Sequence, residues 1–487
     1  MTAPIGTQFQ RLAALGPDEP ALTCDGRTVT HSELDASTNR LARAYADRGV
    51  GVGDYVTICL PNSIEFMQAA IAAWKLGAVP QPLPPRLPDS EFEGLLALRR
   101  RALVVGRPDP AGEIPSIPSG FIPDTALSDA PLPEAVSPSW KSMASGGSTG
   151  RPKLIEAGGD GRLDLAGLAY ALGTQEGDTQ LVSVPLSHNT GMTATTMGLL
   201  LRHHVVLMSR FDPAEFLRLV TRHRVDWLFT VPTIMHRLLP VYRANPDTYD
   251  LSSLRRFWHV GAPCPAAVKD AWIELVGSEV LWELYGGTEL QALSALSGGE
   301  WLQHRGSVGR VLAGEMTVLD DNGDECPPGV IGEVYMRPPP GSPPTYRYIG
   351  ASAKSHGGWD SLGDLGHFDE DGYLYLSDRR VDMFTVGGRN VYPAEVEGAL
   401  CAHPDVLSCL VVGMPDEDLG QVAYALVQAA GLDEASVIEF LRDRIEAYKL
   451  PRTVEFVDMP LRDEAGKARR SAVRADVIAR RQAQGRP

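Results

Sequence analysis

Five short motifs along this chain of 487 residues contain residue types that suit nucleotide chemistry. They lie at residues 145–153, 285–289, 363–366, 378–388 and 466–467. Each motif alone is weak evidence, because glycine-rich turns and single charged residues are common in any globular protein. Their order is more informative, since together they supply glycines, hydroxyls, carboxylates and cations. The set predicts a site, assembled from distant parts of the chain, at which a carboxylate attacks the α-phosphate of ATP.

The first motif is a loop rich in Gly, Ser and Thr that ends in a lysine. Because glycine lacks Cβ, backbone N–H groups and hydroxyls can approach phosphate oxygens closely there. The loop is not a Walker loop, since no Gly-Lys-Ser/Thr closes it. A flexible surface linker is the alternative. The candidate phosphate-binding residues are Ser145, Gly147, Ser148, Thr149, Gly150 and Lys153.

The second motif is Tyr285-Gly286-Gly287-Thr288-Glu289. A carboxylate next to a triphosphate is repelled unless a cation lies between them, so Glu289 is predicted to bind magnesium. Thr288 is then expected to contact the α-phosphate. An ordinary strand–turn–helix junction with a capping threonine is the alternative.

Four further side chains complete the candidate site. Asp364 lies in a glycine-flanked turn and is predicted to accept both ribose hydroxyls, with support from Arg379. Lys467 follows a glycine in a loop, where one cation could stabilise charge that develops only in the transition state. His188 follows a strand end and could gate a pocket. The alternatives are an Asx turn, a surface salt bridge, a solvated lysine and a structural histidine.

Composition limits the function classes. A net charge of −16 and a pI near 5.2 argue against nucleic-acid binding, and solubility explains the charge. The six cysteines form no CxxC pair, which predicts reduced thiols in a cytoplasmic protein. We expect no signal peptide and no membrane span. A homodimer is the commonest soluble assembly, and the oligomeric state stays open.

The pattern of apolar residues predicts an α/β fold of layered sheets and helices. Turns are expected at 321–324 and 369–372, and a largely irregular segment at 105–140. After Arg380 the sequence predicts a compact α/β tail. The elements expected are strands at 181–184, 227–231 and 406–412, helices at 211–224 and 435–447, and a helix that starts at Pro393.

The ordered set of motifs resembles the superfamily of adenylate-forming enzymes, which includes acyl-CoA synthetases, stand-alone adenylation domains and beetle luciferases. The resemblance runs from about residue 34 to 474. The sequence at 146–155 and 357–364 is similar to that of actinobacterial acyl-CoA ligases for fatty, aromatic or steroid-like acids. It implies an acid–CoA ligase that uses ATP, Mg²⁺ and coenzyme A.

The resemblance also implies an organisation. Residues 1–377 would form a large, multi-subdomain acid- and ATP-binding domain, 378–382 a hinge, and 383–487 a small mobile α/β domain. Lys467 would bridge the acid and the α-phosphate in one rotational state. In the other state the loop at Gly387-Gly388 would face the acyl-adenylate and the pantetheine. Adenine would be cradled by Gly261, Ala262, Pro263 and Tyr285.

The chain departs from the family pattern at Gly146, Leu362, Val381 and Asp463. Two other readings therefore stay open. One is a half-reaction enzyme, which either makes a thioester from a supplied adenylate or adenylates an acid for a carrier protein. The other is a degenerate, non-catalytic binding module. The acid itself cannot be read from the sequence, nor can free CoA be distinguished from a carrier protein.

Overall fold

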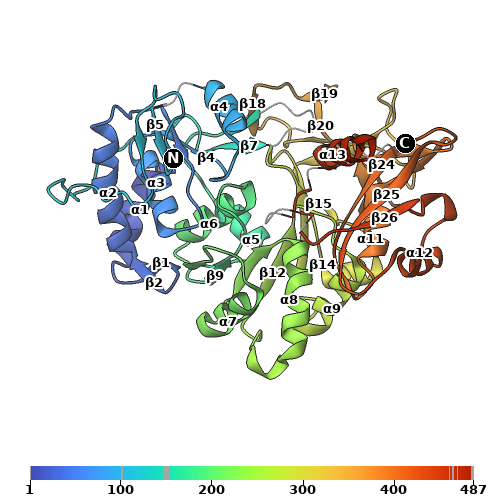
Figure 1. Ribbon diagram of the computed structural model, residues 1–487. Coiled ribbons are helices and arrows are strands. Elements are labelled where there is room, and N and C mark those ends of the chain that lie inside the picture. Colours follow the sequence, from blue (N-terminus) through green and yellow to red (C-terminus); the bar gives the residue numbers. More distant parts are fainter. Residues whose placement is uncertain are drawn as a thin grey trace.

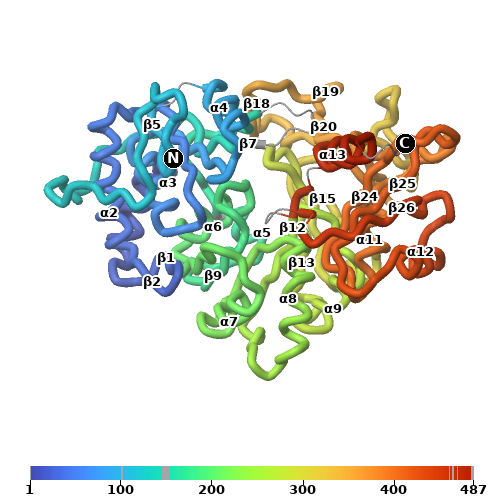
Figure 2. Tube along the Cα trace, viewed as in Figure 1, coloured from blue at the N-terminus to red at the C-terminus, as the bar shows by residue number. Residues whose placement is uncertain are grey.

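The computed structural model describes residues 2–99, 102–145, 153–459, 461–462, 466–468 and 470–483. It confirms a mixed α/β fold with a large N-terminal domain and a small C-terminal one (Figure 1). The trace in Figure 2 runs from an N-terminal region in blue, through a central region in green and yellow, to the C-terminal region in orange and red. Within the described residues, no helix combines the length and the apolar character that crossing a bilayer requires.

The central element is a nine-stranded sheet. Its strands, in spatial order, are β15 (Arg310–Ala313), β14 (Leu293–Ser297), β13 (Leu281–Gly286), β12 (Arg256–Val260), β11 (Trp227–Thr230), β9 (Thr179–Val182), β10 (His204–Leu207), β1 (Pro20–Cys24) and β2 (Arg27–Thr30). The pairs from β13 to β1 are parallel, and both ends of the sheet are antiparallel. Loops that follow neighbouring parallel strands meet at one edge of such a sheet, which is the usual place for a ligand site.

Helices pack on this sheet and connect its strands. They are α5 (Ala166–Ala171), α6 (Asn189–Leu200), α7 (Pro213–His223), α8 (Pro232–Ala244), α9 (Ala266–Val276) and α10 (Gly298–Gln303). Helix α7 begins with Asp212, whose carboxylate accepts a hydrogen bond from the backbone N–H of Glu215. Its buried stripe, Phe216, Leu217 and Val220, has the spacing of one helical face.

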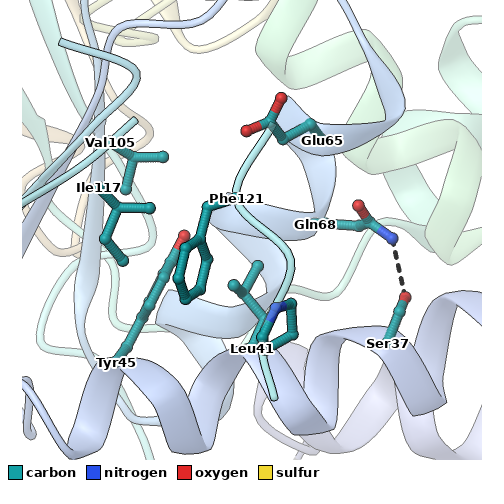
Figure 3. A pocket seen from close by; sticks show the side chains of 9 residues that line it. Ser37, Leu41, Tyr45, Glu65, Gln68, Val105, Ile117 and Phe121 are labelled. Atoms are coloured by element: carbon teal, nitrogen blue, oxygen red, sulfur yellow. Dashed lines mark hydrogen bonds between the residues drawn. The ribbon is translucent and has the colours of Figure 1, made fainter. Parts of the chain in front are cut away.

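A second, parallel sheet lies in the N-terminal region. It contains β4 (Val79–Pro82), β3 (Tyr55–Ile58), β5 (Leu103–Val105) and β6 (Ser116–Ile117), with α1 (Ile5–Leu15), α2 (His31–Ala46), α3 (Ile64–Lys75) and α4 (Asp89–Ala97). Tyr45, Leu41 and Phe121 line a cavity of about 60 Å³ between α2, α3 and β5, beside the hydrogen bond from Gln68 to Ser37 (Figure 3). None of the described candidate site residues lines it.

Two antiparallel sheets complete the large domain. The first is β18 (Tyr346–Ile349), β8 (Lys153–Ala157) and β7 (Ser142–Ser145). The second is β16 (Glu315–Leu319), β17 (Gly332–Arg337), β20 (Trp359–Phe368) and β19 (Lys354–His356), with β21 (Leu374–Arg379) paired to β20. Residues Asp364 and Arg379 are directly opposite one another on β20 and β21, so backbone pairing fixes their approach.

The C-terminal region has its own hydrophobic cores. Its elements are β22 (Phe384–Val386), β23 (Arg389–Val391), α11 (Pro393–Leu400), β24 (Val406–Asp416), β25 (Gly420–Ala429), α12 (Glu434–Arg442), the short 3₁₀ turn η2 (Ala447–Lys449), β26 (Thr453–Phe456) and α13 (Arg470–Ala483). The other 3₁₀ turn among the described residues, η1 (Pro246–Thr248), belongs to the large domain. Strand β24 contacts α8 of the large domain. The two domains therefore touch in this structure.

The expected elements are present with small shifts in their ends. The segment 105–140 is irregular apart from β6, and the helix at Pro393 begins as expected. The helix expected at 435–447 is wrong at its C-terminal end, because α12 stops at Arg442. The chain turns there, with the N–H groups of Arg444 and Ile445 both bonded to the carbonyl of Leu441, and Ile445 packs on the core.

Candidate active site

Two loops from different domains meet at the junction between β11 and α8. A Cβ built on Gly466 would lie 3.4 Å from Thr233 Oγ1 and 3.6 Å from Val231 Cβ. A Cβ built on Gly261, in the loop after β12, would lie 4.0 Å from Val231 Cγ1. Val231 is thus a common neighbour of the proposed adenine loop and of the loop that carries the candidate lysine. The exposed side chain of Lys467 follows directly.

The second cluster is a hydrogen-bonded carboxylate. Tyr285 Oη donates to Asp364 Oδ2 at 2.8 Å, and Arg379 Nε donates to Asp364 Oδ1 at 3.1 Å. Each carboxylate oxygen keeps a further lone pair, so the oriented group can still accept two hydroxyls. Burial, with the neighbouring Asp364, raises the pKa of Tyr285, which therefore stays a hydrogen-bond donor. Asp364 and Arg379, which the sequence predicts to support the same sugar, lie side by side, and their binding of ribose stays a prediction.

The third cluster surrounds the candidate magnesium ligand. Glu289 is buried, and Tyr348 Oη of β18 donates to its Oε1 at 2.5 Å. Lys153 Nζ lies over the face of the same ring, 4.0 Å from its centroid. Burial lowers the pKa of Lys153, while Glu289 opposes that shift. One tyrosine therefore holds a cation from the first motif and a carboxylate from the second close together.

The turn that carries Glu289 is tightly built. A Cβ on Gly287 would lie 2.5 Å from Glu289 Oε2 and 2.5 Å from Leu362 Cδ1, so a side chain there would displace both. Leu290 has a φ of 51°, a left-handed conformation that is uncommon for a side chain of this kind. Its N–H closes the turn on the carbonyl of Gly287 at 3.1 Å. Such local strain is characteristic of functional sites.

The first motif connects two antiparallel strands. Ser145 and Lys153 are paired across β7 and β8, so the two ends of the motif lie side by side. Its other candidates lie outside the described residues; they are Gly147, Ser148, Thr149 and Gly150, together with Gly146.

The remaining candidates occupy separate places. His188 occupies the position directly before α6 and is half-buried. Ala262 and Pro263 follow Gly261 in the loop before α9, and Gly286 and Thr288 flank Gly287 in its turn. The turn Gly387-Gly388 is exposed between β22 and β23, and the N–H of Gly387 donates to the carbonyl of Leu419 in its own domain. The structure thus brings the lysine loop against the large domain, whereas the turn at Gly387-Gly388 is exposed and is bonded to its own domain.

A buried glutamate that the sequence did not single out supports the lysine loop. Arg462 donates to Glu397 Oε2 at 2.6 Å and to the carbonyl of Gly466 at 3.3 Å. Arg470 donates to Glu397 Oε1 at 2.6 Å and to Asp382 Oδ2 at 2.8 Å. Glu397 therefore connects both flanks of the loop to the predicted hinge. Its only sequence signal is its place on α11 after Pro393.

A buried lysine is the second residue that the sequence analysis missed. Lys141 precedes β7 and is 1% exposed, and its ammonium donates to Asn189 Oδ1 and Thr193 Oγ1 of α6. Burial lowers the pKa of Lys141 to about 7. Lys141 thus anchors the first turn of α6, and the candidate site residue His188 directly precedes that turn.

The low pKa of Lys141 predicts a measurable pH dependence of stability. Between pH values of about 7 and 10.5 the unfolded chain binds the proton that the folded chain has lost, so the contribution of this group to stability rises with pH. Lys141→Met should lower the slope of unfolding free energy against pH by up to about 1.4 kcal/mol per pH unit in that window. Urea denaturation at several pH values measures it. Lys354→Met, which removes a surface ammonium paired with Glu333, should leave the slope unchanged.

Comparisons with known proteins agree with this geometry. A 2-succinylbenzoate–CoA ligase from Bacillus licheniformis is 30% identical over 95% of this chain and 98% of its own. A feruloyl-CoA synthase from an Amycolatopsis species is 31% identical over 96% and 98%. The o-succinylbenzoate CoA synthetase from Bacillus subtilis, solved with its acyl-adenylate intermediate, superimposes with a TM-score of 0.84 at 26% identity, over 97% of this chain and 98% of that one.

Family models give the same assignment for both domains. The model of the AMP-binding enzyme matches residues 9–343, and the model of its C-terminal domain matches residues 395–467. The first match includes Tyr285 and Glu289, and the second includes Glu397 and Lys467. With the family of the large domain and that of the small domain both present in this order, the chain belongs to the AMP-binding enzyme family.

Proposed function

We propose that this protein is an ATP-dependent acid–CoA ligase that works through an acyl-adenylate. The main observation behind this proposal is that the loop of Lys467 contacts Val231 and Thr233 of the large domain through Gly466. Gly261 and Gly466, the residue before Lys467, both approach Val231, and this supports a role for Lys467 near the loop of Gly261. The assignment is supported by relatives named for CoA ligation and by a structural neighbour that contains an acyl-adenylate.

In the first half-reaction a carboxylate oxygen of the acid attacks the α-phosphorus of ATP. A new P–O bond forms, the bond to the β-phosphate oxygen breaks, and pyrophosphate leaves. Asp364 accepts the ribose hydroxyls and Lys153 faces the phosphate chain. Lys467 stabilises the charge that accumulates on the α-phosphate and the attacking carboxylate, an electrostatic role for which a preorganised cation is effective.

The donors present fit a magnesium ion. Glu289 supplies a buried carboxylate with one oxygen oriented by Tyr348, and magnesium prefers oxygen ligands with partners from substrate phosphates. When bound, such an ion neutralises charge on the phosphates. The structural neighbour from Bacillus subtilis has also been solved with ATP and magnesium.

The second half-reaction needs a different domain arrangement. The CoA thiolate attacks the acyl carbon, the acyl–phosphate C–O bond breaks, and AMP leaves. The exposed turn Gly387-Gly388 would reach the adenylate only after the small domain rotates, with residues 378–382 as the hinge. A turn closes there, since the N–H of Asp382 donates to the carbonyl of Arg379 at 3.0 Å. Burial raises the pKa of Asp378, at the start of this hinge, to about 6.

Separate measurement of the two half-reactions tests the assignment. Acid-dependent exchange of pyrophosphate into ATP reports adenylation, and thioester formation with free CoA reports the whole reaction. A panel of aliphatic, aromatic and polycyclic acids should show both activities for at least one acid class. Exchange without thioester formation would favour transfer to a carrier protein. Absence of both activities across the panel would support the non-catalytic reading. We also propose a cytosolic location, which six cysteines without a disulfide favour.

Glu289→Gln should raise the magnesium concentration needed for half-maximal exchange about 10-fold, because an amide is a weaker ligand than a carboxylate. The measurement is a magnesium titration of the exchange rate at saturating ATP. Glu274→Gln, at an exposed position of α9, serves as the control for loss of one negative charge. Equal magnesium requirements in Glu289→Gln and wild type would remove Glu289 from the metal site.

A further inference from the structure

Two thiols of the small domain are in direct contact. Cys401 caps the C-terminus of α11, and Cys409 lies on β24. Their sulfur atoms are 3.4 Å apart, and both thiols are free. Neither thiol is among the residues assigned above to ATP, magnesium or CoA. A contact of two free thiols is the arrangement from which a disulfide forms with a small movement.

The two thiols differ in environment. Cys401 is half-buried, whereas Cys409 is 1% exposed. The hydrogen bond from Cys409, with the nearby Arg462 guanidinium, lowers the pKa of Cys401, while the same contact and burial raise the pKa of Cys409. The thiolate is the reactive form of cysteine. Cys401 is thus suited to react first and Cys409 to resolve the product.

The pair also contacts the residue that supports the lysine loop. The carbonyl of Glu397 accepts the N–H of Cys401 at 2.9 Å and lies 3.5 Å from Cys409 Sγ. The carboxylate of Glu397 binds Arg462, which in turn binds the carbonyl of Gly466. A continuous set of contacts therefore runs from the two sulfur atoms to the residue that precedes Lys467.

We propose that Cys401 and Cys409 are a redox-reactive pair that a hydroperoxide converts to a disulfide, and that this disulfide slows adenylation. The Cys401 thiolate attacks the peroxide, so that an S–O bond forms, the O–O bond breaks, and water or an alcohol leaves. Cys409 then attacks the sulfenic sulfur, an S–S bond forms, the S–O bond breaks, and water leaves. The two thiols supply the two electrons and the protons that reduce the peroxide.

The disulfide must move groups that are closely packed. Its sulfur atoms lie about 2.0 Å apart, well below the observed 3.4 Å, so bond formation draws the Cys401 side chain at the end of α11 and the Cys409 side chain on β24 toward one another. Protein interiors transmit such shifts because they contain few voids. Glu397 is held by both elements and passes the shift to Arg462. Displacement of a catalytic group by about 1 Å costs up to about 10²-fold in rate, and we expect a fall of about 10-fold here.

A third thiol makes the pairing testable. Cys264 follows the adenine loop of the large domain. Burial raises the pKa of its thiol, the Lys269 ammonium opposes that rise, and the charges of Glu283 and Cys401 add to it. The Cys401 thiol of the small domain is therefore near enough to Cys264 for their charges to interact. A bond between Cys264 and Cys401 would tie the domains together, which differs from the pairing proposed.

The test treats the reduced, full-length protein with hydrogen peroxide. Intact mass should fall by about 2 Da per chain and return with dithiothreitol. Cleavage before Asp405 separates Cys401 from Cys409, so the two peptides should stay joined only before reduction. Exchange of pyrophosphate into ATP should fall about 10-fold in the oxidised protein and recover on reduction. Thioester formation from a supplied acyl-adenylate should change little.

Variants assign the effect to this pair. Cys401→Ser and, as a second test, Cys409→Ala should lose the joined peptides and the peroxide effect, whereas Cys326→Ala should keep both. Linkage of Cys264 to Cys401, an unchanged mass, or a disulfide that leaves exchange unaffected would overturn the proposal. The consequence for adenylation rests on the proposed function, but the mass and peptide results do not. Hydrogen exchange at residues 461–468, which should rise on oxidation, reports the loop even in a protein without ligase activity.

Discussion

Lys467→Ala should reduce the rate of ATP–pyrophosphate exchange on the order of 10²- to 10³-fold. The lysine lies in the loop that packs on Val231 and Thr233, and its charge is needed while pyrophosphate leaves. Thioester formation from a chemically supplied acyl-adenylate should stay within about 3-fold of wild type, because that step has no leaving pyrophosphate for the cation to stabilise.

The small domain offers a matched control for this change. Lys449 is the other lysine of residues 383–487, and its ammonium pairs with Glu395 and Glu446. Lys449→Ala should leave the exchange rate near wild type. Should Lys467→Ala reduce both half-reactions to the same extent, the lysine would be a structural residue of the small domain rather than a group specific to adenylation.

Sequence reasoning predicts which residues lie together where residue type and local turn chemistry determine position, while the roles of the candidate site residues stay predictions. Asp364 and Arg379 were expected to act together, and strand pairing does bring them together. The turn at 369–372 follows from an aspartate and a glycine at their favoured positions, and the N–H of Tyr373 indeed bonds to Asp369 Oδ1. These signals depend on neighbouring residues, which a single sequence displays directly.

The contacts missed are those made by residues without a motif. Tyr348 contacts Glu289 and Lys153 because β18 pairs with β8, a register that depends on two segments far apart in the chain. Glu397 and Lys141 are charged residues whose meaning depends on burial, and a charge in a sequence normally indicates a solvated surface. The end of α12 was misplaced for a related reason, since tertiary packing of Ile445 overrides local helix propensity.

The cysteines also show what composition can and cannot predict. Composition predicted free thiols, and the six cysteines are free. Composition could not predict that Cys401 and Cys409 touch, because their separation in sequence is compatible with many distances. Only the packing of α11 on β24 brings the sulfur atoms to 3.4 Å and places Glu397 between them and the lysine loop.

Asp364→Ala should raise the Kd of ATP on the order of 10²-fold, because two hydrogen bonds to a charged acceptor are lost, each contributing about 1.5 kcal/mol or more. Calorimetric titration of the protein with ATP measures the change. The oxygens of Asp364 are oriented by Tyr285 and Arg379, so the loss should not depend on the acid that is present. Asp320→Ala, in an exposed turn, controls for the removal of one carboxylate.

A sugar analogue separates ribose recognition from a general loss of structure. Removing one hydroxyl in 2′-deoxy-ATP should weaken binding to the wild-type protein about 10-fold, since one of the two charge-assisted hydrogen bonds is then absent. In Asp364→Ala the same substitution should cost almost nothing, because the acceptor is already gone. A double-mutant cycle built from these four dissociation constants isolates the contact itself. If 2′-deoxy-ATP weakens binding equally in both proteins, Asp364 accepts no 2′-hydroxyl, and the cluster with Tyr285 and Arg379 would instead support the structure of β20 and β21.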